Sequence, residues 1–283
     1  RKVIQDAFEQ NITHAPGMEH VREMVTGPII PTPGAVMECT KLLYEYLGDL
    51  IVLDVGGATT DLHSVTVESD QVARLMISPE PKAKRTVEGD LGVYVNRWKV
   101  VESIGEEKLR EQCREQGFSM EHALETYRAI PKTEEEVKLV ELLTREAVVK
   151  AAERHAGRLR YIYGPSGRST VAEGKDLTQV KYIVGTGGAL TRLPHREEIM
   201  REITRCNESG MLLLPGEHAQ ILVDHDYIMA SLGVLSKRYP QAAARLLEQS
   251  LGITFPERKA EEPVPVCNKE LSRLETQRQQ REE

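Results

Sequence analysis

Paired cysteines, long apolar runs and an excess of positive charge are all missing from this sequence, and each absence excludes a class of protein. The cysteines are scattered, at Cys39, Cys113, Cys206 and Cys267. Without a Cys-x-x-Cys spacing, they favour free thiols over a disulfide framework or a zinc site. No apolar run approaches the roughly 20 residues of a membrane helix. The net charge is −7, and no basic stretch is interleaved with aromatic residues. We therefore expect a cytoplasmic protein that binds neither membrane nor nucleic acid.

The most informative segment is a glycine-rich turn between two apolar runs, at residues 51–65. The first run ends at a carboxylate, Asp54, and the turn then reads Gly-Gly-Ala-Thr-Thr-Asp through residues 56–61. Glycines let consecutive N–H groups converge on an anion, threonine hydroxyls add donors, and a carboxylate at a strand end can hold a hydrated divalent cation. The segment therefore predicts a β-hairpin that grips phosphate. The alternative is an ordinary hairpin with a Gly-Gly turn, which does not explain Asp54 or the Thr-Thr-Asp exit.

A second glycine turn lies at residues 182–194, where a short apolar run passes through Gly-Thr-Gly-Gly into a helical pattern. Backbone can approach a ligand closely there, and the helix N-terminus favours negative charge. The turn is not the dinucleotide-binding fingerprint, because Leu190 stands where the third glycine would fall. Residues 164–170 are not a Walker loop either, because the spacing is too short and Arg168 replaces the lysine. They predict a surface turn.

Strands and helices alternate along the chain, which predicts the α/β class. Apolar alternation places the strands, which are expected at residues 50–54, 62–67, 71–77, 161–163 and 181–184. The first three follow one another closely and predict a β-meander. Helical spacing of apolar residues places the helices, which are expected at residues 1–10, 34–47, 105–157, 194–205 and 226–237.

The helical stretch at residues 105–157 predicts an insertion or subdomain. Gly117 and Pro131 break this stretch, and Thr133 followed by Glu136 predicts a capping box at the start of a long amphipathic helix. The tail at residues 256–283 is charged, proline-punctuated and poor in large apolar residues, so weak order is expected there.

Four segments, in the correct order, resemble the nucleotide-binding half of the actin, sugar kinase and heat-shock chaperone superfamily. They look like the first connecting helix at residues 31–36, the second phosphate motif at 54–61, the adenosine motif at 185–194 and the second connecting helix at 230–234. Within the superfamily, the wording DVGGATTDLHSV, with PTPGAV before it and TVEGDLG and VGTGGALT after it, closely resembles the MutL/GlmL family. Those proteins accompany adenosylcobalamin-dependent amino-acid mutases such as glutamate mutase and are regarded as their reactivating factors.

The resemblance implies an actin-like ATPase (ribonuclease H-like) lobe with an inserted helical subdomain. Residues 1–40 would be a remnant of a first lobe with its connecting helix, and residues 41–225 the second nucleotide-binding lobe with the insertion at 105–157. Residues 226–255 would hold the second connecting helix and a C-terminal helix, followed by the tail. The superfamily's first phosphate hairpin is absent, so we expect an N-terminal lobe that this sequence does not include.

The resemblance also implies a site for ATP and Mg²⁺. Asp54 would be the catalytic carboxylate that orients a water on the metal. The β- and γ-phosphates would be held by the second phosphate motif, namely Gly56, Gly57, Ala58, Thr59, Thr60 and Asp61. The ribose and α-phosphate would be flanked by the adenosine motif, namely Gly185, Thr186, Gly187 and Gly188. Asp61 would either orient the hairpin or approach the metal. Glu88 and Asp90 would either reach the cleft or form a solvated turn.

Three further residues qualify this interpretation. Ile30 stands where related heat-shock chaperones carry a glutamate that supports hydrolysis, so hydrolysis would be slow or would use a residue of the missing lobe. His63 is expected to be a strand histidine and not a cobalamin ligand, because Thr66 replaces the glycine of the Asp-x-His-x-x-Gly pattern. Asp226, in the segment Asp224-His225-Asp226, is expected to cap a helix and not to bind a metal.

The leading hypothesis is an ATP-dependent reactivating factor that loosens a partner mutase so that damaged cobalamin can leave, with the inserted helices at residues 105–157 as the contact surface. A small-molecule kinase of the same superfamily is the first alternative, and ATP turnover only with a small acceptor would identify it. An actin-like scaffold protein is the second, and nucleotide-dependent sedimentation would identify that one.

Overall fold

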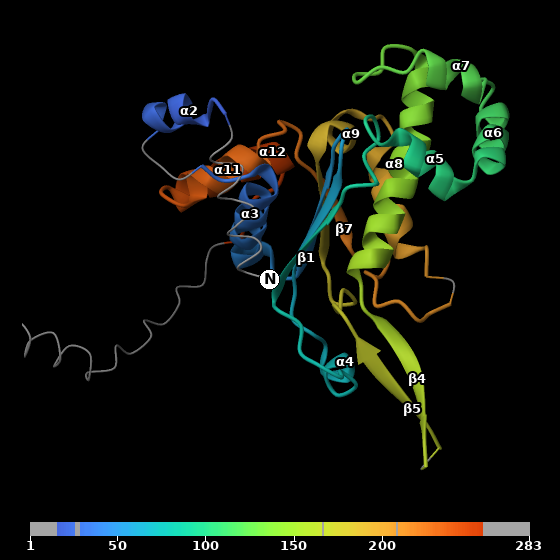
Figure 1. Cartoon of the computed structure of the whole chain (residues 1–283). Helices are drawn as coiled ribbons and strands as arrows, with labels where there is room; N and C mark the ends of the chain where they lie inside the picture. The colour runs from blue at the N-terminus through green and yellow to red at the C-terminus, as the bar shows by residue number, and fades with distance from the viewer. Residues whose placement is uncertain (1–15, 26–28, 166, 208, 257–283) are drawn as a thin grey trace, which may run out of the picture.

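A five-stranded mixed sheet forms the centre of the computed structural model, which describes residues 16–25, 29–165, 167–207 and 209–256. The strands lie in the order β3-β2-β1-β6-β7, with helices on both faces (Figure 1). They are β1 (Leu50–Val55), β2 (Thr60–Val65), β3 (Ala83–Glu88), β6 (Tyr182–Thr186) and β7 (Gln220–Val223). The predicted α/β class is confirmed. The helix predicted at residues 1–10 and the tail beyond residue 256 lie outside the described residues.

The strand β1 lies in the middle of the sheet because its side chains are apolar on both faces. It pairs antiparallel with β2, which pairs antiparallel with β3, whereas β6 and β7 run parallel to β1. Leu50 and Val52 belong to the core on one face, and Ile51, Leu53 and Val55 belong to the core on the other. Burial on both faces explains why this strand reads as a continuous apolar run.

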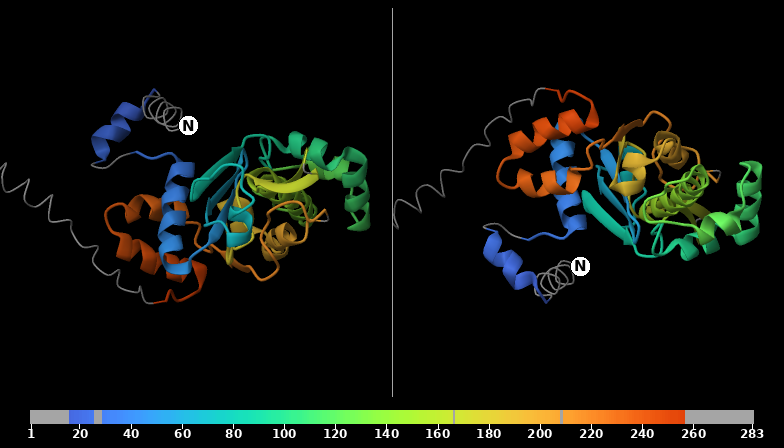
Figure 2. Two further views of the ribbon diagram at one scale, coloured as in Figure 1. Left: turned by 90° about the horizontal axis from the view of Figure 1, so that it is seen from below. Right: turned by 90° about the horizontal axis from the view of Figure 1, so that it is seen from above.

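Different helices cover the two faces of the sheet (Figure 2). One face, which we call the α3 face, carries α3 (Thr32–Leu47), α11 (Met229–Ser236) and α12 (Pro240–Leu251). The other, which we call the α8 face, carries α8 (Glu134–His155), α9 (Gly187–Arg192) and α10 (Arg196–Arg201). A short helix, α2 (Met18–Met24), precedes α3. The boundary predicted after residue 40 falls inside α3.

The helices α3 and α11 cross at very close range on the α3 face. A β-carbon built on Gly233 would lie 1.8 Å from the carbonyl oxygen of Ala35 and 3.2 Å from the amide nitrogen of Cys39. Two backbones can approach this closely only where a side chain is missing. The two segments that resemble connecting helices therefore form one packed unit against the sheet.

The helical subdomain begins earlier than predicted, at residue 97 and not at 105. Before α8 it contains α5 (Arg97–Ile104), α6 (Glu106–Glu115) and α7 (Met120–Glu125). Gly117, with a φ of 83°, lies in the predicted break between α6 and α7. The predicted capping box is confirmed, because the Glu136 amide donates to the Thr133 hydroxyl at 3.2 Å and the Glu136 carboxylate accepts from the Thr133 amide at 3.1 Å.

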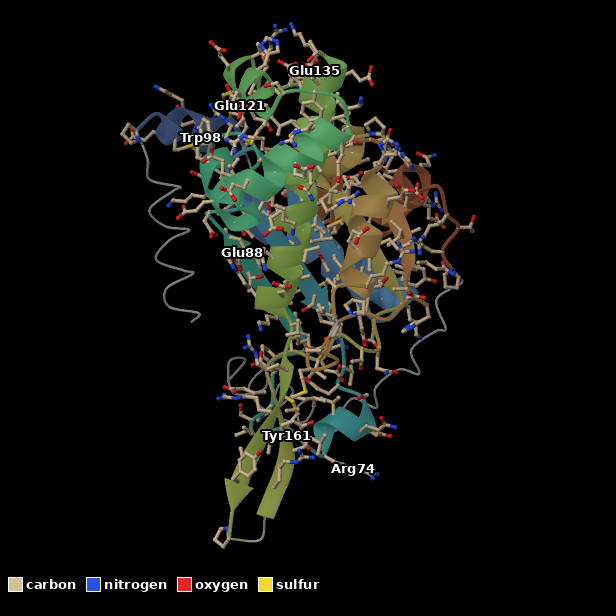
Figure 3. All side chains as sticks on the ribbon, turned by 90° about the vertical axis from the view of Figure 1, so that its right-hand side faces the viewer. Arg74, Glu88, Trp98, Glu121, Glu135 and Tyr161 are labelled. Atoms are coloured by element: carbon tan, nitrogen blue, oxygen red, sulfur yellow. The ribbon has the colours of Figure 1, made fainter. Side chains whose placement is uncertain are left out.

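A two-stranded arm extends from the body of the molecule, as Figures 1 and 3 show. It consists of β4 (Arg158–Gly164) and β5 (Gly167–Glu173), which pair antiparallel. The surface turn predicted at residues 164–170 is therefore only the tip of the arm, since the chain from Gly167 onward is a strand. Tyr161 and Tyr163 on the arm are exposed.

The strand predicted at residues 71–77 is wrong, and the third strand of the meander is β3. A short helix, α4 (Asp70–Ala73), forms there instead, because the Ser69 hydroxyl accepts a hydrogen bond from the Val72 amide. The carboxylate of Asp176 in turn accepts from the Ser69 amide and hydroxyl, at 3.0 Å each. The strand β3 reads Ala-Lys-Arg-Thr-Val-Glu and lies at the edge of the sheet, so it lacks the apolar alternation that reveals a strand.

Among the described residues, no helix is long and apolar enough to cross a membrane.

Replacing Gly233 with alanine should lower the free energy of unfolding by about 1 to 3 kcal/mol, because the new methyl group would collide with the backbone of α3. The sign is informative, since alanine in place of a helical glycine without a clash stabilises a helix by about 1 kcal/mol. Urea denaturation measures the change. Gly89→Ala is the control, since a β-carbon there meets nothing within 4 Å. Equal stability of the two variants would contradict the close crossing.

Candidate functional site

The β-hairpin predicted at residues 51–65 is confirmed, with its turn between β1 and β2, while its binding of phosphate stays a prediction. Asp54 is paired with Asp61 and Val55 with Thr60, so residues 56–59 form the turn. The Gly56 amide donates to the Thr59 carbonyl at 2.9 Å and closes it. The three remaining amides of the turn, those of Gly57, Ala58 and Thr59, have no acceptor among the described residues. Such a set of free N–H groups is what an anion-binding turn requires.

A second segment, residues 89–96, holds the hairpin turn in place by donating hydrogen bonds to the carbonyl groups of the turn. The amides of Tyr94 and Val95 donate to the Gly57 carbonyl at 2.9 and 2.7 Å, and the Asn96 side chain donates to the Ala58 carbonyl at 2.7 Å. Gly92 is needed for this contact, since a β-carbon there would lie 2.2 Å from the Ala58 carbonyl. Because the carbonyls are bound by the protein, the turn has its amides left for a ligand.

Four polar side chains form a row across the α3 face at the ends of the strands. Side chains at paired positions of adjacent strands point to the same face. Asp61 is paired with Asp54, and Asp54 with Thr186, whose hydroxyl donates to the Asp224 carboxylate at 2.8 Å. Asp224 is fully buried and also accepts from the Ile228 and Met229 amides at 3.2 and 3.0 Å. The prediction that Asp226 caps a helix is wrong. The amides at the start of α11 donate to Asp224 instead.

Two carboxylates of the row have raised pKa values. Burial, with a smaller effect from the charge of Asp224, raises the pKa of Asp54 to about 6. Burial, with a smaller effect from Asp54, raises the pKa of Asp61 to about 7. One oxygen of Asp61 is buried without a hydrogen-bond partner among the described residues. The pair therefore favours any cation that would neutralise it.

The row does not form a complete metal cage. Within the described parts of the chain, no group of three or more His, Cys, Asp or Glu side chains could hold a metal ion. Mg²⁺, however, is usually bound through one or two carboxylates together with water and the phosphates of a ligand. Asp54 and Asp61 fit that mode of binding, in which the ligand completes the coordination.

The second glycine turn packs directly against the first. Gly187 has a φ of 85°, and a β-carbon there would lie 2.5 Å from the Asp54 carboxylate and 2.6 Å from the Val55 backbone. A β-carbon on Gly185 would lie 2.6 Å from the sulfur of Met200. Position 187 therefore needs glycine because of the protein's own packing, whereas a side chain at position 185 would require the end of the Met200 side chain to move. Gly188 differs, since a β-carbon there meets nothing within 4 Å.

A cavity of about 510 Å³ lies beside the two turns. Its lining includes Gly56 and Gly57 of the first turn, Gly188 of the second, and residues of the segment 127–140 that leads into α8. Tyr94 and Tyr127 line it with their rings stacked, 5.8 Å between centroids. The wall is therefore aromatic and aliphatic, with unpaired backbone amides at one end. Such a wall fits a ligand with a flat apolar part and an anionic part.

The structure brings Asp54, the turn at residues 56–59, Thr60 and Asp61 together with the turn at residues 185–188. Thr60 points away from the acidic row, and its hydroxyl donates to the Leu91 carbonyl at 2.8 Å. The sequence did not predict Asp224 as the end of the row, nor Tyr94 and Tyr127 as lining residues. Asp224 follows β7, an undetected strand of only four residues.

The remaining candidates have structural partners or remain buried in the sheet. Glu88 and Asp90 bind Arg154 of α8, at 2.7 and 2.8 Å. His63 lies in β2, as predicted, and is fully buried. Burial and the nearby charge of Arg85 lower its pKa to about 3. Cys39, Cys113 and Cys206 are free thiols, as predicted, whereas Cys267 lies outside the described residues.

Comparison with known proteins gives two matches. The family described as MutL protein matches residues 1–251. The protein MutL of Clostridium tetanomorphum is 34% identical over 263 residues, which is 89% of this chain and 57% of the relative. The chain therefore spans little more than half the length of this curated relative.

Replacing Asp61 with asparagine should raise the free energy of unfolding near pH 8 by about 1 to 3 kcal/mol, since one pKa unit corresponds to about 1.4 kcal/mol. The folded pKa of about 7 lies above the ordinary value of 3.8, so the folded state binds the proton more tightly. Stability from this group is therefore present at low pH and is lost as the pH rises from about 4 to about 7.

Urea denaturation at about pH 5 and pH 8 measures this effect. Asp226→Asn is the control, because Asp226 is exposed. The advantage of Asp61→Asn over the parent protein should appear at the higher pH and shrink at the lower one. An equal difference at both values would exclude a raised pKa at Asp61.

Proposed function

The chain belongs to the MutL family, and on that premise we propose that it binds ATP and Mg²⁺ as part of a reactivating factor for an adenosylcobalamin-dependent mutase. Glutamate mutase is the proposed type of partner, because the family that the sequence resembles accompanies such enzymes. The observation that carries the proposal is the hairpin turn, with three unpaired amides beside Asp54 and the aromatic cavity. The same proposal includes an actin-like fold for the nucleotide-binding lobe and a cytoplasmic location for the protein.

The hairpin turn would bind the β- and γ-phosphates through backbone amides. The amides of Gly57, Ala58 and Thr59 have no acceptor within the described chain, and the segment at residues 89–96 fixes the turn through its carbonyls. The binding groups are therefore ordered before a ligand arrives, which reduces the entropy cost of binding. The Thr59 hydroxyl interacts with the Asp61 carboxylate and would add a donor only by turning from it to the phosphate.

Asp54 and Asp61 would hold Mg²⁺ through its water shell. Both have raised pKa values, so a divalent cation would convert them to the charged form. The ion would supply charge neutralisation for the phosphates. Asp54 would accept a hydrogen bond from a metal-bound water and fix its orientation.

The aromatic cavity would take the adenosine part of the nucleotide. Tyr94 and Tyr127 offer a flat apolar wall, and Gly188 leaves room beside it. Arg192 also lines the cavity and could neutralise an α-phosphate. In this assignment Gly188 needs to be glycine because of the ligand, whereas Gly187 needs it because of internal packing.

Hydrolysis by this chain alone should be slow. Phosphoryl transfer relies on groups that surround the phosphates and position a water. The described residues provide one phosphate hairpin, and an isoleucine, Ile30, precedes the Pro-Thr of α3. We therefore propose that binding and the attendant change in shape, more than rapid turnover, act on the partner.

Replacing Gly188 with valine should weaken ATP binding at least about tenfold in Kd, because the side chain would project into the space that the nucleotide needs. The melting temperature should stay within about 2 °C of the parent value, since a β-carbon at this position meets no protein atom within 4 Å. Calorimetric titration with ATP and Mg²⁺ measures the affinity. Gly164→Val, at the tip of the arm, is the control with an equally open position. Unchanged affinity in Gly188→Val would remove the adenosine assignment.

Binding to an inactivated adenosylcobalamin-dependent mutase should depend on ATP and Mg²⁺, and Asp54→Asn should remove that dependence. The substitution preserves shape but removes the charge that attracts the hydrated metal ion. Biosensor measurements with purified glutamate mutase, with and without nucleotide, give the comparison. An affinity for the mutase that is the same with and without nucleotide would overturn the reactivating-factor proposal. ATP turnover that requires a small acceptor would favour the kinase alternative instead.

A further inference from the structure

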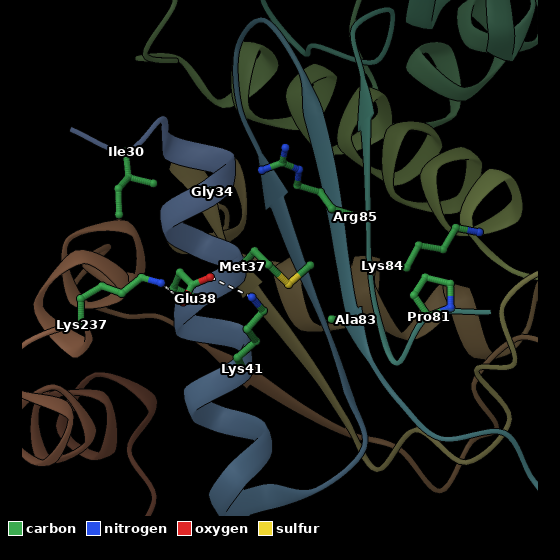
Figure 4. Close-up of a pocket in the computed structure, with 10 residues that line it drawn as sticks. All are labelled: Ile30, Gly34, Met37, Glu38, Lys41, Pro81, Ala83, Lys84, Arg85 and Lys237. Atoms are coloured by element: carbon green, nitrogen blue, oxygen red, sulfur yellow. Dashed lines mark hydrogen bonds and ion pairs between the residues drawn. The ribbon is translucent and has the colours of Figure 1, made fainter. Parts of the chain in front are cut away.

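A second pocket of about 510 Å³ lies between α3 and the edge strand β3 (Figure 4). One wall comes from α3 and carries Met37, Glu38 and Lys41, and the other comes from β3 and carries Arg85. Lys237, which follows α11, closes one end. No residue of this pocket lines the aromatic cavity, which lies on the α8 side of the hairpin. The two pockets are therefore separate.

The charged groups of this pocket are mostly paired with one another. The Glu38 carboxylate accepts from Lys41 at 2.8 Å and also binds Lys237. Both ammonium groups lower the pKa of Glu38, so it stays charged. Lys84 donates to the His155 carbonyl at 3.0 Å, and Figure 4 shows its side chain directed away from Arg85. The single acid that lines the pocket, Glu38, thus forms ion pairs with two lysines.

Arg85 is left as a half-buried cation without an ionic partner. Its guanidinium has no hydrogen bond and no carboxylate within 4.0 Å among the described residues. Its nearest neighbour in the sheet is the paired residue His63, which is fully buried and neutral. Asp61 lies on the same face, and the charge of Arg85 partly offsets the rise of the Asp61 pKa, but the two side chains form no ion pair within 4.0 Å. A half-buried guanidinium with five free donors pays for desolvation without a compensating bond.

We propose that this pocket, which we call the Arg85 pocket, binds a small ligand through an oxyanion group, a carboxylate or a phosphate. Arg85 is its principal donor, because a planar guanidinium matches either group with two parallel hydrogen bonds. Lys41 and Lys237 make the entrance positive, since together with Arg85 they outnumber Glu38 by three charges to one. The side chains of Ile30 and Met37 offer an apolar surface for the body of the ligand. Its volume is in the range of small-molecule sites.

Calorimetric titration of the full chain with inorganic phosphate and with malonate tests the proposal. The parent protein should bind one of the two, and Arg85→Met should weaken that binding at least about tenfold. Arg74→Met is the matched control, because Arg74 is exposed and does not line the pocket. The preferred probe tells whether the natural ligand carries a phosphate or a carboxylate. The hairpin turn can also bind phosphate, so the difference between parent and Arg85→Met is the quantity that decides.

A second variant predicts a change in the opposite direction. Glu38→Gln removes the only acid of the pocket and releases two ammonium groups, so the same probe should bind more tightly, by a factor of about three or more. This outcome does not depend on whether Arg85→Met folds. Equal binding by the parent, Arg85→Met and Glu38→Gln would overturn the assignment. ATP affinity should be unchanged in Glu38→Gln, which separates this result from the nucleotide proposal.

Discussion

The hydrogen bonds between residues 89–96 and the hairpin turn are the interaction on which the candidate site depends. They bind the carbonyls of Gly56, Gly57 and Ala58 on one side, so the amides of the turn remain available on the other. The contact requires Gly92, because any side chain there would collide with Ala58. A four-residue turn without such support would rearrange among several conformations. The anion-binding geometry is therefore a property of two segments that lie more than 30 residues apart, and not of the glycine motif alone.

The packing of α3 against α11 has a comparable role for the rest of the sheet. Gly233 lets the two helices touch through their backbones, and both then cover Leu50, Val52 and Val184 of the central strands. Asp224 extends this unit toward the site, because it accepts hydrogen bonds from the start of α11 and from Thr186 of β6. The acidic row is thus connected to the helices that resemble connecting elements. A shift of α11 would therefore move the groups that donate hydrogen bonds to Asp224, so that the helix and the acidic row are physically coupled.

Much of this arrangement could be predicted from the sequence, and the failures have physical causes. The hairpin, the second glycine turn, α3 and the capping box at Thr133 carry strong local signals, and all were found. The edge strand β3 was missed because it is half-exposed and carries Lys84, Arg85 and Glu88, so apolar alternation is absent. Asp224 was missed because its role comes from tertiary contacts, which a short sequence segment does not reveal. The nucleotide, metal and partner assignments remain predictions.

Gly187 has a consequence for how the sequence of this family can diverge. Its φ of 85° and its contact with Asp54 are properties of the folded chain without any ligand. A relative that had lost nucleotide binding would still need glycine at this position to keep its sheet intact. Retention of the Gly-Thr-Gly-Gly wording across relatives would therefore report on folding. Retention of a small residue at position 188, where the protein leaves free space, would be the better indicator that binding has been kept under selection.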